Sequence, residues 1–460
     1  MRMEMTLEQL ETPVRYSCDV AVCGGGTAGF VAALAAARNG ARTILIEERG
    51  YVGGTLVNGA GPLHSFFNLY NAWPEAGKVQ LVHGIAQELV DRLQKRGGSF
   101  GHLEQKKGGD YDSMITLIDW ESFKELALEM LEEAGVKLLL HTSVAAVRKA
   151  QNRVTGLILQ GRSGREALSA KVVVDTTGNA DVAALAGCGF VKRHQTTSVG
   201  MPFSMANVDM TRLVTWLKEK ELITQLIEGD KGSDIDHVIR LGFNLKKVPE
   251  FTRIMEETGM WGPLGYSYHE NEFTYINATS VKSVDATDTE AVTAAEIALR
   301  HQVWLLSEML KKYIPGFENA YVSWTPDSIG VRLTRIVECM HEMTLEEITE
   351  GKRFDDEVFL YGFHDCAPRI TIREGKWYGF PYRAMVPARI DGILAAGRCL
   401  TGTWEAHMST RNTVSCMAQG QAAGTAAALS AAENTIPREL DVQKLRAVLK
   451  EQGVLLDVKK

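Results

Sequence analysis

The stretch that decides the fold is DVAVCGGGTAGFVAALAAARNGARTILIE, residues 19–47. It begins with a short apolar run of the kind that forms a strand buried on both faces of a sheet. The glycine pattern G-x-G-x-x-G follows at residues 24–29, then an alanine-rich segment with helical character, and then a second apolar run that ends at Glu47. This order of strand, glycine turn, helix and strand predicts a βαβ unit that binds a dinucleotide.

Each glycine of the pattern has a physical role. Gly24 permits the tight turn from strand to helix, Gly26 lets the backbone approach a pyrophosphate, and Gly29 allows the helix to pack closely on the strand. The helix N-terminus at Thr27 and Ala28 offers free N–H groups and a partial positive charge to the phosphates. We therefore expect the phosphates of the dinucleotide to lie at this turn.

Glu47 and the glycine-rich stretch after it extend the expected ligand site. Glu47 lies about 20 residues beyond the glycines, where a carboxylate can accept hydrogen bonds from the hydroxyl groups of the adenosine ribose. Residues 49–64 contain five glycines, so their backbone can lie against a flat or charged ligand. His64 ends this stretch, and we weigh a role in ligand chemistry equally against that of an exposed or capping histidine.

Composition bounds the function classes. The chain has 460 residues, enough for two or three structural domains, and its balance of apolar and charged residues is that of a soluble globular protein. A net charge of −7 without a lysine or arginine cluster argues against a nucleic-acid partner. No apolar run reaches the roughly 18 residues of a membrane span, and the first residues lack the apolar region of a signal peptide.

The cysteines predict reduced, buried thiols in a cytoplasmic protein. There are seven, and none forms a C-x-x-C pair. Neither they nor the dispersed histidines have the spacing of metal ligands, so we predict no metal site.

The first part of the chain continues with helical and strand patterns. We expect helices over residues 84–96 and 120–133, and a polar, glycine-rich surface loop over residues 97–112. Strands follow, of which residues 144–148 and 154–159 form a β-meander. The last strand, residues 170–175, runs into Thr177, Gly178 and Asp181, as expected at the ligand crevice of a parallel sheet.

The chain then changes character and later returns to the opening pattern. Residues 191–385 suggest an inserted α+β substrate or cap domain, with helices at 210–227 and at 289–313, the second capped by Asp288. Another short strand ends at Gly397. An alanine- and glycine-rich helix follows from Thr413, in which Gly420 and Gly424 let a neighbouring backbone approach closely. We assign residues 1–190 and 386–435 to the ligand-binding domain and 436–460 to a C-terminal helix.

Three glycine-ended strands, near residues 24, 178 and 397, are far apart in the sequence and are best united around one extended ligand. FAD has the required length, with its ADP half on the opening unit and its isoalloxazine near the late helix. The N-terminus of that helix, at residues 413–416, would stabilise negative charge on the reduced flavin. We therefore predict FAD as the cofactor.

Several stretches also carry a family resemblance. Residues 20–47, 50–55, 172–187, 378–387 and 392–429 resemble the FAD-dependent oxidoreductases whose flavin domain is of the glutathione-reductase type, distantly similar to fumarate reductase flavoproteins. The resemblance implies a Rossmann-like α/β FAD domain with a parallel sheet and a β-meander. Residue by residue, it implies FAD contacts at Gly24, Gly26, Gly29, Glu47, Gly54, Thr55, Val144, Gly178, Asp181, Gly397 and from Asn412 to Ser415.

The chain departs from the family pattern at one place. Where members commonly have T-G-D-G-D, this sequence has Asn179 and Ala180 in place of the first acid and the glycine. Only Asp181 keeps its carboxylate there, so the contact at this position differs in detail.

The favoured function is hydride transfer between the flavin and a small polar organic substrate. We name His64 and His407 as acid/base candidates and Arg411 as an anion clamp, weighed equally against a salt bridge that orders the flavin loop. His364 and Asp365 form a further, less favoured pair. The alternatives are a flavin monooxygenase that uses NAD(P)H and oxygen, and a flavin-binding subunit or sensor without turnover. We expect a small-molecule substrate and no membrane partner, and leave a homo-oligomer open.

Overall fold

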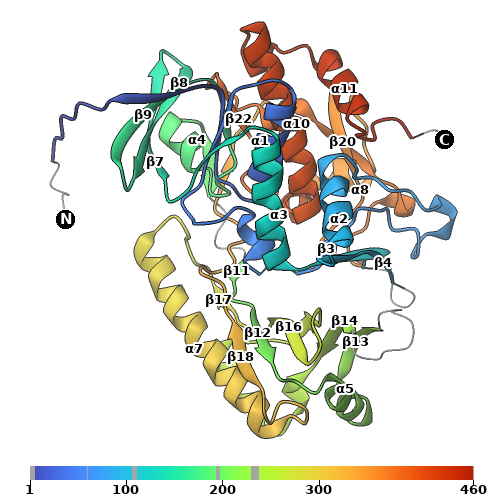
Figure 1. Cartoon of the computed structure of the whole chain (residues 1–460). Helices are drawn as coiled ribbons and strands as arrows, with labels where there is room; N and C mark the ends of the chain where they lie inside the picture. Colours follow the sequence, from blue (N-terminus) through green and yellow to red (C-terminus); the bar gives the residue numbers. More distant parts are fainter. Residues whose placement is uncertain (1–5, 60, 106–110, 193–196, 229–237, 459–460) are drawn as a thin grey trace.

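The computed structural model describes residues 6–59, 61–105, 111–192, 197–228 and 238–458. Its larger part, at the top of Figure 1, is built on a seven-stranded sheet in the order β6-β2-β1-β9-β8-β7, with β22 also paired to β9. The strands are β1 (Val14–Cys23), β2 (Thr43–Ile46), β6 (Lys137–Leu139), β7 (Ser143–Ala150), β8 (Arg153–Gly161), β9 (Gly164–Asp175) and β22 (Ile393–Ala395).

Strand β9 belongs to two arrangements at once. Its first half pairs antiparallel with β8, and β8 pairs antiparallel with β7, which confirms the predicted meander. Its last residues lie parallel to β22, and most of the strand lies parallel to β1, whose other neighbour β2 is also parallel. The expected α/β fold with a parallel sheet and a meander is confirmed.

Helices α1 (Thr27–Arg38) and α10 (Thr413–Glu433) lie side by side against this sheet (Figure 1). A Cβ atom on Gly420 would lie 2.2 Å from the carbonyl oxygen of Ala28, and one on Gly424 would lie 2.1 Å from that of Ala32. The two glycines therefore permit the close backbone approach that the sequence predicts. Helix α3 (Trp120–Glu133) joins this core through Phe123, whose ring centroid is 5.5 Å from that of Phe30.

A three-stranded sheet, β3-β5-β4, lies at the lower edge of this part of the molecule (Figure 1). Its strands are β3 (Leu63–His64), β4 (Ser99–Glu104) and β5 (Met114–Ile118). The prediction of a surface loop over residues 97–112 is therefore wrong for Ser99–Glu104. These residues form β4 because they pair with the fully buried strand β5. Residues 106–110 of that expected loop lie outside the described residues.

The second hydrophobic core is formed by buried residues from Val199 to Ile329, at the bottom of Figure 1. Its six-stranded antiparallel sheet has the order β13-β14-β15-β16-β12-β18. The predicted helix over residues 210–227 ends at Glu219 instead, because residues from Ile223 pair with β14. The elements are β12 (Phe203–Ala206), α5 (Met210–Glu219), β13 (Ile223–Glu228), β14 (Val238–Phe243), α6 (Pro249–Thr258), β15 (Leu264–Tyr266), β16 (Glu272–Asn277), α7 (Thr289–Tyr313) and β18 (Tyr321–Trp324).

The buried residues from Val337 on pack into the first core. The expected domain boundary at residue 385 stays a prediction, and the tail forms the expected helix α11. The remaining elements are α2 (Ile85–Lys95), α4 (Asp181–Ala186), β10 (Phe190–Lys192), β11 (Ser198–Val199), β17 (Val281–Lys282), β19 (Arg335–Val337), α8 (Leu345–Thr349), β20 (Glu357–Tyr361), β21 (Tyr378–Pro381), α9 (Trp404–Thr410) and α11 (Val442–Glu451). Within the described part of the chain, no helix has both the length and the apolar character needed to cross a membrane.

Candidate functional site

The three glycine-ended strands finish at one edge of the sheet. Cys23 of β1 and Ala395 of β22 both stand opposite Asp175 of β9 in parallel register. The turns that follow these strands therefore meet at the carboxyl edge, where open α/β sheets bind their ligands. This is the convergence that we expect around one extended ligand.

The turn into α1 has the geometry that its glycines predict. Gly24 has φ +92°, and a Cβ atom there would lie 2.8 Å from the carbonyl oxygen of Thr176. A Cβ atom on Gly29 would lie 1.8 Å from the carbonyl oxygen of Gly24. A Cβ atom on Gly26, by contrast, would meet no protein atom within 4 Å, and no side chain caps the helix that begins at Thr27. The backbone here thus leaves space and free N–H groups for a phosphate.

The segment after β2 packs onto the same turn. The amide of Gly53 donates to the carbonyl oxygen of Gly25 over 2.7 Å, and the hydroxyl of Thr27 donates to that of Gly53 over 3.4 Å. Gly54 stands so close that its Cβ atom would lie 2.8 Å from the Cα atom of Gly26. Thr55 follows in the 3-10 helix of Gly54–Val57.

Glu47 is buried and is held by backbone amides. Its Oε2 accepts from the amide of Gly25 at 2.6 Å and its Oε1 accepts from that of Arg49 at 2.8 Å. Burial raises the pKa of the Glu47 carboxyl, and the two amide hydrogen bonds oppose this shift. Each oxygen retains a second lone pair for a ribose hydroxyl. Val144, the expected adenine-side contact, lies on β7 opposite Leu159.

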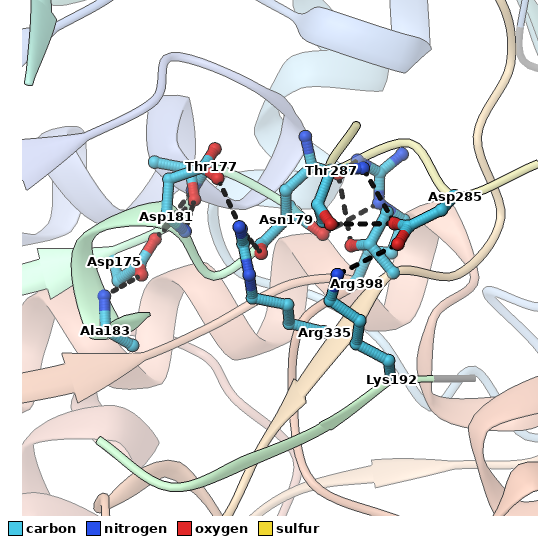
Figure 2. A network of polar contacts seen from close by, with 12 residues as sticks. Asp175, Thr177, Asn179, Asp181, Ala183, Lys192, Asp285, Thr287, Arg335 and Arg398 are labelled. Atoms are coloured by element: carbon cyan, nitrogen blue, oxygen red, sulfur yellow. Dashed lines mark hydrogen bonds and ion pairs between the residues drawn. The ribbon is translucent and has the colours of Figure 1, made fainter. Parts of the chain in front are cut away.

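Asp175 organises the crevice loop after β9 (Figure 2). Its Oδ1 accepts from the amide of Thr177 at 3.0 Å and from the Thr177 hydroxyl at 2.7 Å, while its Oδ2 accepts from the amide of Ala183 at 2.7 Å. These bonds fix both ends of the loop that carries Gly178 and Asp181. The carboxylate is fully buried, and this burial raises its pKa despite the hydrogen bonds.

The departure at Asn179 has a structural explanation. The Arg398 guanidinium, next to Gly397, donates from Nε to the carbonyl oxygen of Gly178 at 2.9 Å and from Nη2 to Oδ1 of Asn179 at 2.7 Å (Figure 2). The amide oxygen of Asn179 thus orders this arginine without a carboxylate. Asp181 instead accepts from Nη1 of Arg335 at 2.7 Å.

Gln419 of α10 joins the end of β22 to the loop before the helix. Its Oε1 accepts from the amide of Gly397 at 2.7 Å, and its Nε2 donates to the carbonyl oxygen of Thr410 at 2.6 Å and to Oγ of Ser415 at 3.1 Å. The fully buried Ser415 side chain therefore faces Gln419. Asn412, the residue that begins α10, makes no capping bond with its side chain, so the first-turn amides have no cap there.

The structure places Gly397 against Ala28, since a Cβ atom on Gly397 would lie 3.2 Å from that of Ala28. The start of α1, the end of β22 and the start of α10 are thus brought together. These residues fit FAD by their open glycine turn and uncapped helix starts, and they would hold its pyrophosphate and flavin. Contacts of the individual residues with FAD stay predictions.

His64 lies on β3 in a polar and aromatic environment. Its Nδ1 is 2.9 Å from Oδ2 of Asp112, a fully buried carboxylate that also accepts from the amide of Ser65 at 3.1 Å. The imidazole stacks on Phe363 with centroids 5.4 Å apart and planes at 7°. Because the carboxylate accepts the Nδ1 proton, Nε2 is the atom available for proton exchange.

The other acid/base candidates lie deeper in the protein. His407, in α9, is fully buried. His364 is also buried and uses both ring nitrogens, Nε2 toward the carbonyl oxygen of Glu405 at 2.8 Å and Nδ1 toward the amide of Cys366 at 3.1 Å. Burial lowers the pKa of His364, and the two hydrogen bonds make its ring a link between loops.

Arg411 lies just before α10, and its Nη2 contacts the carboxylate of Asp365. This is the salt bridge that we weigh against the role of anion clamp, and its Nε has no hydrogen-bond partner among the described residues. Sequence reasoning missed Asp112, Tyr111, Arg240 and Arg332, which also belong to this region. No short motif contains them, so no local signal could have found them.

Comparisons with known proteins identify the family. Residues 19–449 match the family described as FAD dependent oxidoreductase. Mitochondrial dihydrolipoyl dehydrogenase 2 of Arabidopsis thaliana is 39% identical over 74 residues, 16% of this chain and 15% of the relative. Dihydrolipoamide dehydrogenase of Chaetomium thermophilum is 28% identical over 172 residues, 35% of this chain and 32% of the relative.

The chain therefore spans about a third or less of the length of these curated relatives. Among solved structures, a geranylgeranyl bacteriochlorophyll reductase-like protein from Thermoplasma acidophilum aligns over 95% of this chain and 84% of its own. With 13% identity and a TM-score of 0.50, this likeness concerns the fold.

The match over nearly the whole chain and the glycine turns that meet at one sheet edge lead to the same conclusion. The chain belongs to the FAD dependent oxidoreductase family, and its cofactor is FAD.

Proposed function

We propose that the enzyme transfers a hydride between flavin N5 and a small polar organic substrate, with His64 as the acid/base. The observation that carries this proposal is the hydrogen bond of 2.9 Å between His64 and the buried Asp112. It occurs at the end of the glycine-rich stretch that begins beside the predicted pyrophosphate turn. His407 is the weaker candidate because its side chain has no exposure, whereas 15% of the His64 side chain is exposed.

Bound FAD supplies the hydride acceptor or donor, and the residues of the chain supply proton transfer and charge stabilisation. Asp112 fixes the tautomer and the orientation of His64, so that Nε2 can take or give the proton of the substrate. The N-terminus of α10, with Asn412 making no side-chain cap, favours negative charge on a reduced flavin.

The test is anaerobic flavin bleaching of the FAD-loaded protein with a panel of hydroxy acids, polyols, sugars and amines. With a substrate from the panel, His64→Gln is expected to slow flavin reduction by roughly 10²–10⁴-fold, while FAD absorbance stays unchanged. The matched control is His301→Gln, an exposed position on α7. If His64→Gln reduces its flavin as fast as the control, the acid/base role is wrong.

Further measurements on the FAD-loaded protein separate the two alternative functions. Rapid reduction by NAD(P)H, with oxygen consumed when substrate is added, would favour the monooxygenase. A flavin that no donor reduces, together with a stable protein partner, would favour the non-catalytic subunit. The predictions of a small-molecule substrate, of no nucleic-acid or membrane partner, of a homo-oligomer left open and of a cytoplasmic location stay predictions.

A further inference from the structure

An arginine of the second hydrophobic core lies buried beside the His64 region and has no ionic partner among the residues that the structure describes. Arg240, on β14, is 6% exposed, and its Nε and Nη1 have no hydrogen-bond partner among the described residues. Its Cζ lies 4.6 Å from the ring centroid of Tyr111. The Tyr111 ring in turn meets the His64 ring edge-on at 5.4 Å. Arg240 thus belongs to the surroundings of the proposed acid/base.

Two more arginines lie in the same region. Arg411 contacts Asp365 through Nη2 and leaves Nε without a partner, and Arg332 donates from Nη1 to the carbonyl oxygen of Ser198 at 2.7 Å. Burial and the charge of Arg411 both lower the pKa of Arg332, so these two guanidinium groups act on each other electrostatically.

The charges of Arg332 and Arg240 both act on Tyr275. The charges of both arginines oppose the effect of burial, which raises the pKa of the Tyr275 phenol. Tyr275 also lies by the glycine-rich stretch that leads to His64, since a Cβ atom on Gly61 would be 3.5 Å from its ring. The charges of the three arginines therefore act on one region, to which both hydrophobic cores contribute residues.

The charges in this region do not balance. Among the described residues, three guanidinium groups share the region with two carboxylates: Asp365, which pairs with Arg411, and Asp112, which hydrogen-bonds to His64. No ion pair of Arg240 or Arg332 occurs within the part of the chain that the structure describes. Leaving a buried charge without a partner is costly, and a protein retains such a group where a ligand supplies the opposite charge. Arginine presents paired N–H donors that match the two oxygens of a carboxylate.

We propose that Arg240, Arg332 and Arg411 bind the carboxylate group of an organic anion and hold it beside His64. This rests on the proposed function, because it makes the organic anion the substrate of that same site. The inserted part of the chain then selects the substrate by its charge, and the FAD-binding part carries the chemistry.

The test is equilibrium binding to the FAD-loaded protein, measured without turnover by flavin difference spectra and by the shift in Tm. The probes are acetate, benzoate and succinate, with acetamide, benzamide and succinamide as neutral counterparts, and inorganic phosphate as a second anion. We expect carboxylates to bind and their amides not to bind. Failure of every carboxylate to bind, or binding of phosphate alone, would overturn the proposal.

Variants show whether the arginines carry this binding. Arg240→Gln and Arg332→Gln are each expected to weaken carboxylate binding by about 10- to 100-fold, the effect of losing a hydrogen bond to a charged group. Arg240→Lys should retain part of the affinity. The matched control is Arg253→Gln, which removes an 86% exposed positive charge on α6 of the same core. Equal effects of Arg240→Gln and Arg253→Gln, or a loss of FAD from Arg240→Gln, would refute the assignment.

A stability measurement guards against misfolding of the variants. Replacing an uncompensated buried charge by an apolar side chain of similar size should stabilise the anion-free protein. Arg240→Met is therefore expected to raise the Tm without anion and to lose the additional Tm rise that a carboxylate gives. A lower Tm without anion would show that Arg240 is satisfied in the free protein and would overturn the proposal.

The two proposals can fail separately. Arg240-dependent carboxylate binding, combined with full flavin reduction in His64→Gln, would leave the anion site standing and remove the acid/base role. Slow reduction in His64→Gln, without carboxylate binding, would do the reverse.

Discussion

Adding one methyl group at Gly26 should separate FAD binding from folding. The backbone of Gly26 has φ −66° and ψ −171°, which alanine adopts without strain, and its Cβ atom would meet no protein atom within 4 Å. Alanine gains about 0.4–1 kcal/mol by restricting the unfolded chain and loses up to about 1 kcal/mol as a poorer N-cap. We therefore expect the free energy of unfolding of the apoprotein to change little in Gly26→Ala.

The same methyl group points into the space predicted for the pyrophosphate. Overpacking of a close contact costs about 1–3 kcal/mol, which corresponds to a roughly 5- to 150-fold weaker binding of FAD. The assay is a titration of apoprotein with FAD, followed by flavin fluorescence, with thermal unfolding of the same samples.

Gly29→Ala is the matched comparison for this prediction. Its Cβ atom would lie 1.8 Å from the carbonyl oxygen of Gly24, so this variant should lose stability as well as FAD affinity. If Gly26→Ala binds FAD as tightly as the unaltered protein, the phosphates do not lie at this turn. If its apoprotein unfolds at a much lower temperature, the space beside Gly26 is a structural requirement instead of a ligand site.

Two further predictions concern stability. Gly420→Ala gains about 1 kcal/mol in helix propensity, but its Cβ atom would lie 2.2 Å from the carbonyl oxygen of Ala28. We therefore expect the free energy of unfolding to fall by about 1–2 kcal/mol, with a lower Tm. A higher Tm would contradict the close packing of α10 on α1. His269 is 3.0 Å from Asp119, and the hydrogen bond between them raises the pKa of His269. The ion pair therefore stabilises the fold fully below the unfolded pKa of about 6.5, and its contribution is lost as the pH rises through the folded pKa. Because the His269 side chain is 53% exposed, His269→Ala should cost about 0.2–1 kcal/mol at pH 5 and less at pH 9, and a Tm difference that is independent of pH would refute the ion pair.

Elements with strong local signals could be predicted from the sequence. Helix α7 runs from Thr289 to Tyr313 as expected, because Asp288 accepts from the amide of Ala291 at 2.8 Å and so marks its start. The glycine pattern at residues 24–29 predicts the turn for the same reason, since positive φ and close approach demand glycine at fixed spacing.

Elements that depend on distant pairing could not be predicted. Ser99–Glu104 is polar and becomes a strand only because it pairs with β5, and Ile223 leaves the helical pattern because it pairs with Phe243 on β14. Asp112 meets His64 across 48 positions of sequence, and nothing in the sequence near Asp112 distinguishes it from other acidic residues of a loop. Tertiary contacts determine these positions, and single-sequence patterns do not record them.

This division follows the two halves of the proposed site. The cofactor half rests on backbone geometry, for which glycine at Gly24 and Gly29 is the physical requirement, so a short motif predicts it. The substrate half rests on side-chain charge brought together by folding, with Arg411 from the first core and Arg240 from the second. A carboxylate held between the two cores would pair with arginines from both, so its binding should stabilise the packing of one core against the other. The substrate specificity is then to be sought in the residues of the second core, which lie outside the stretches that carry the family resemblance.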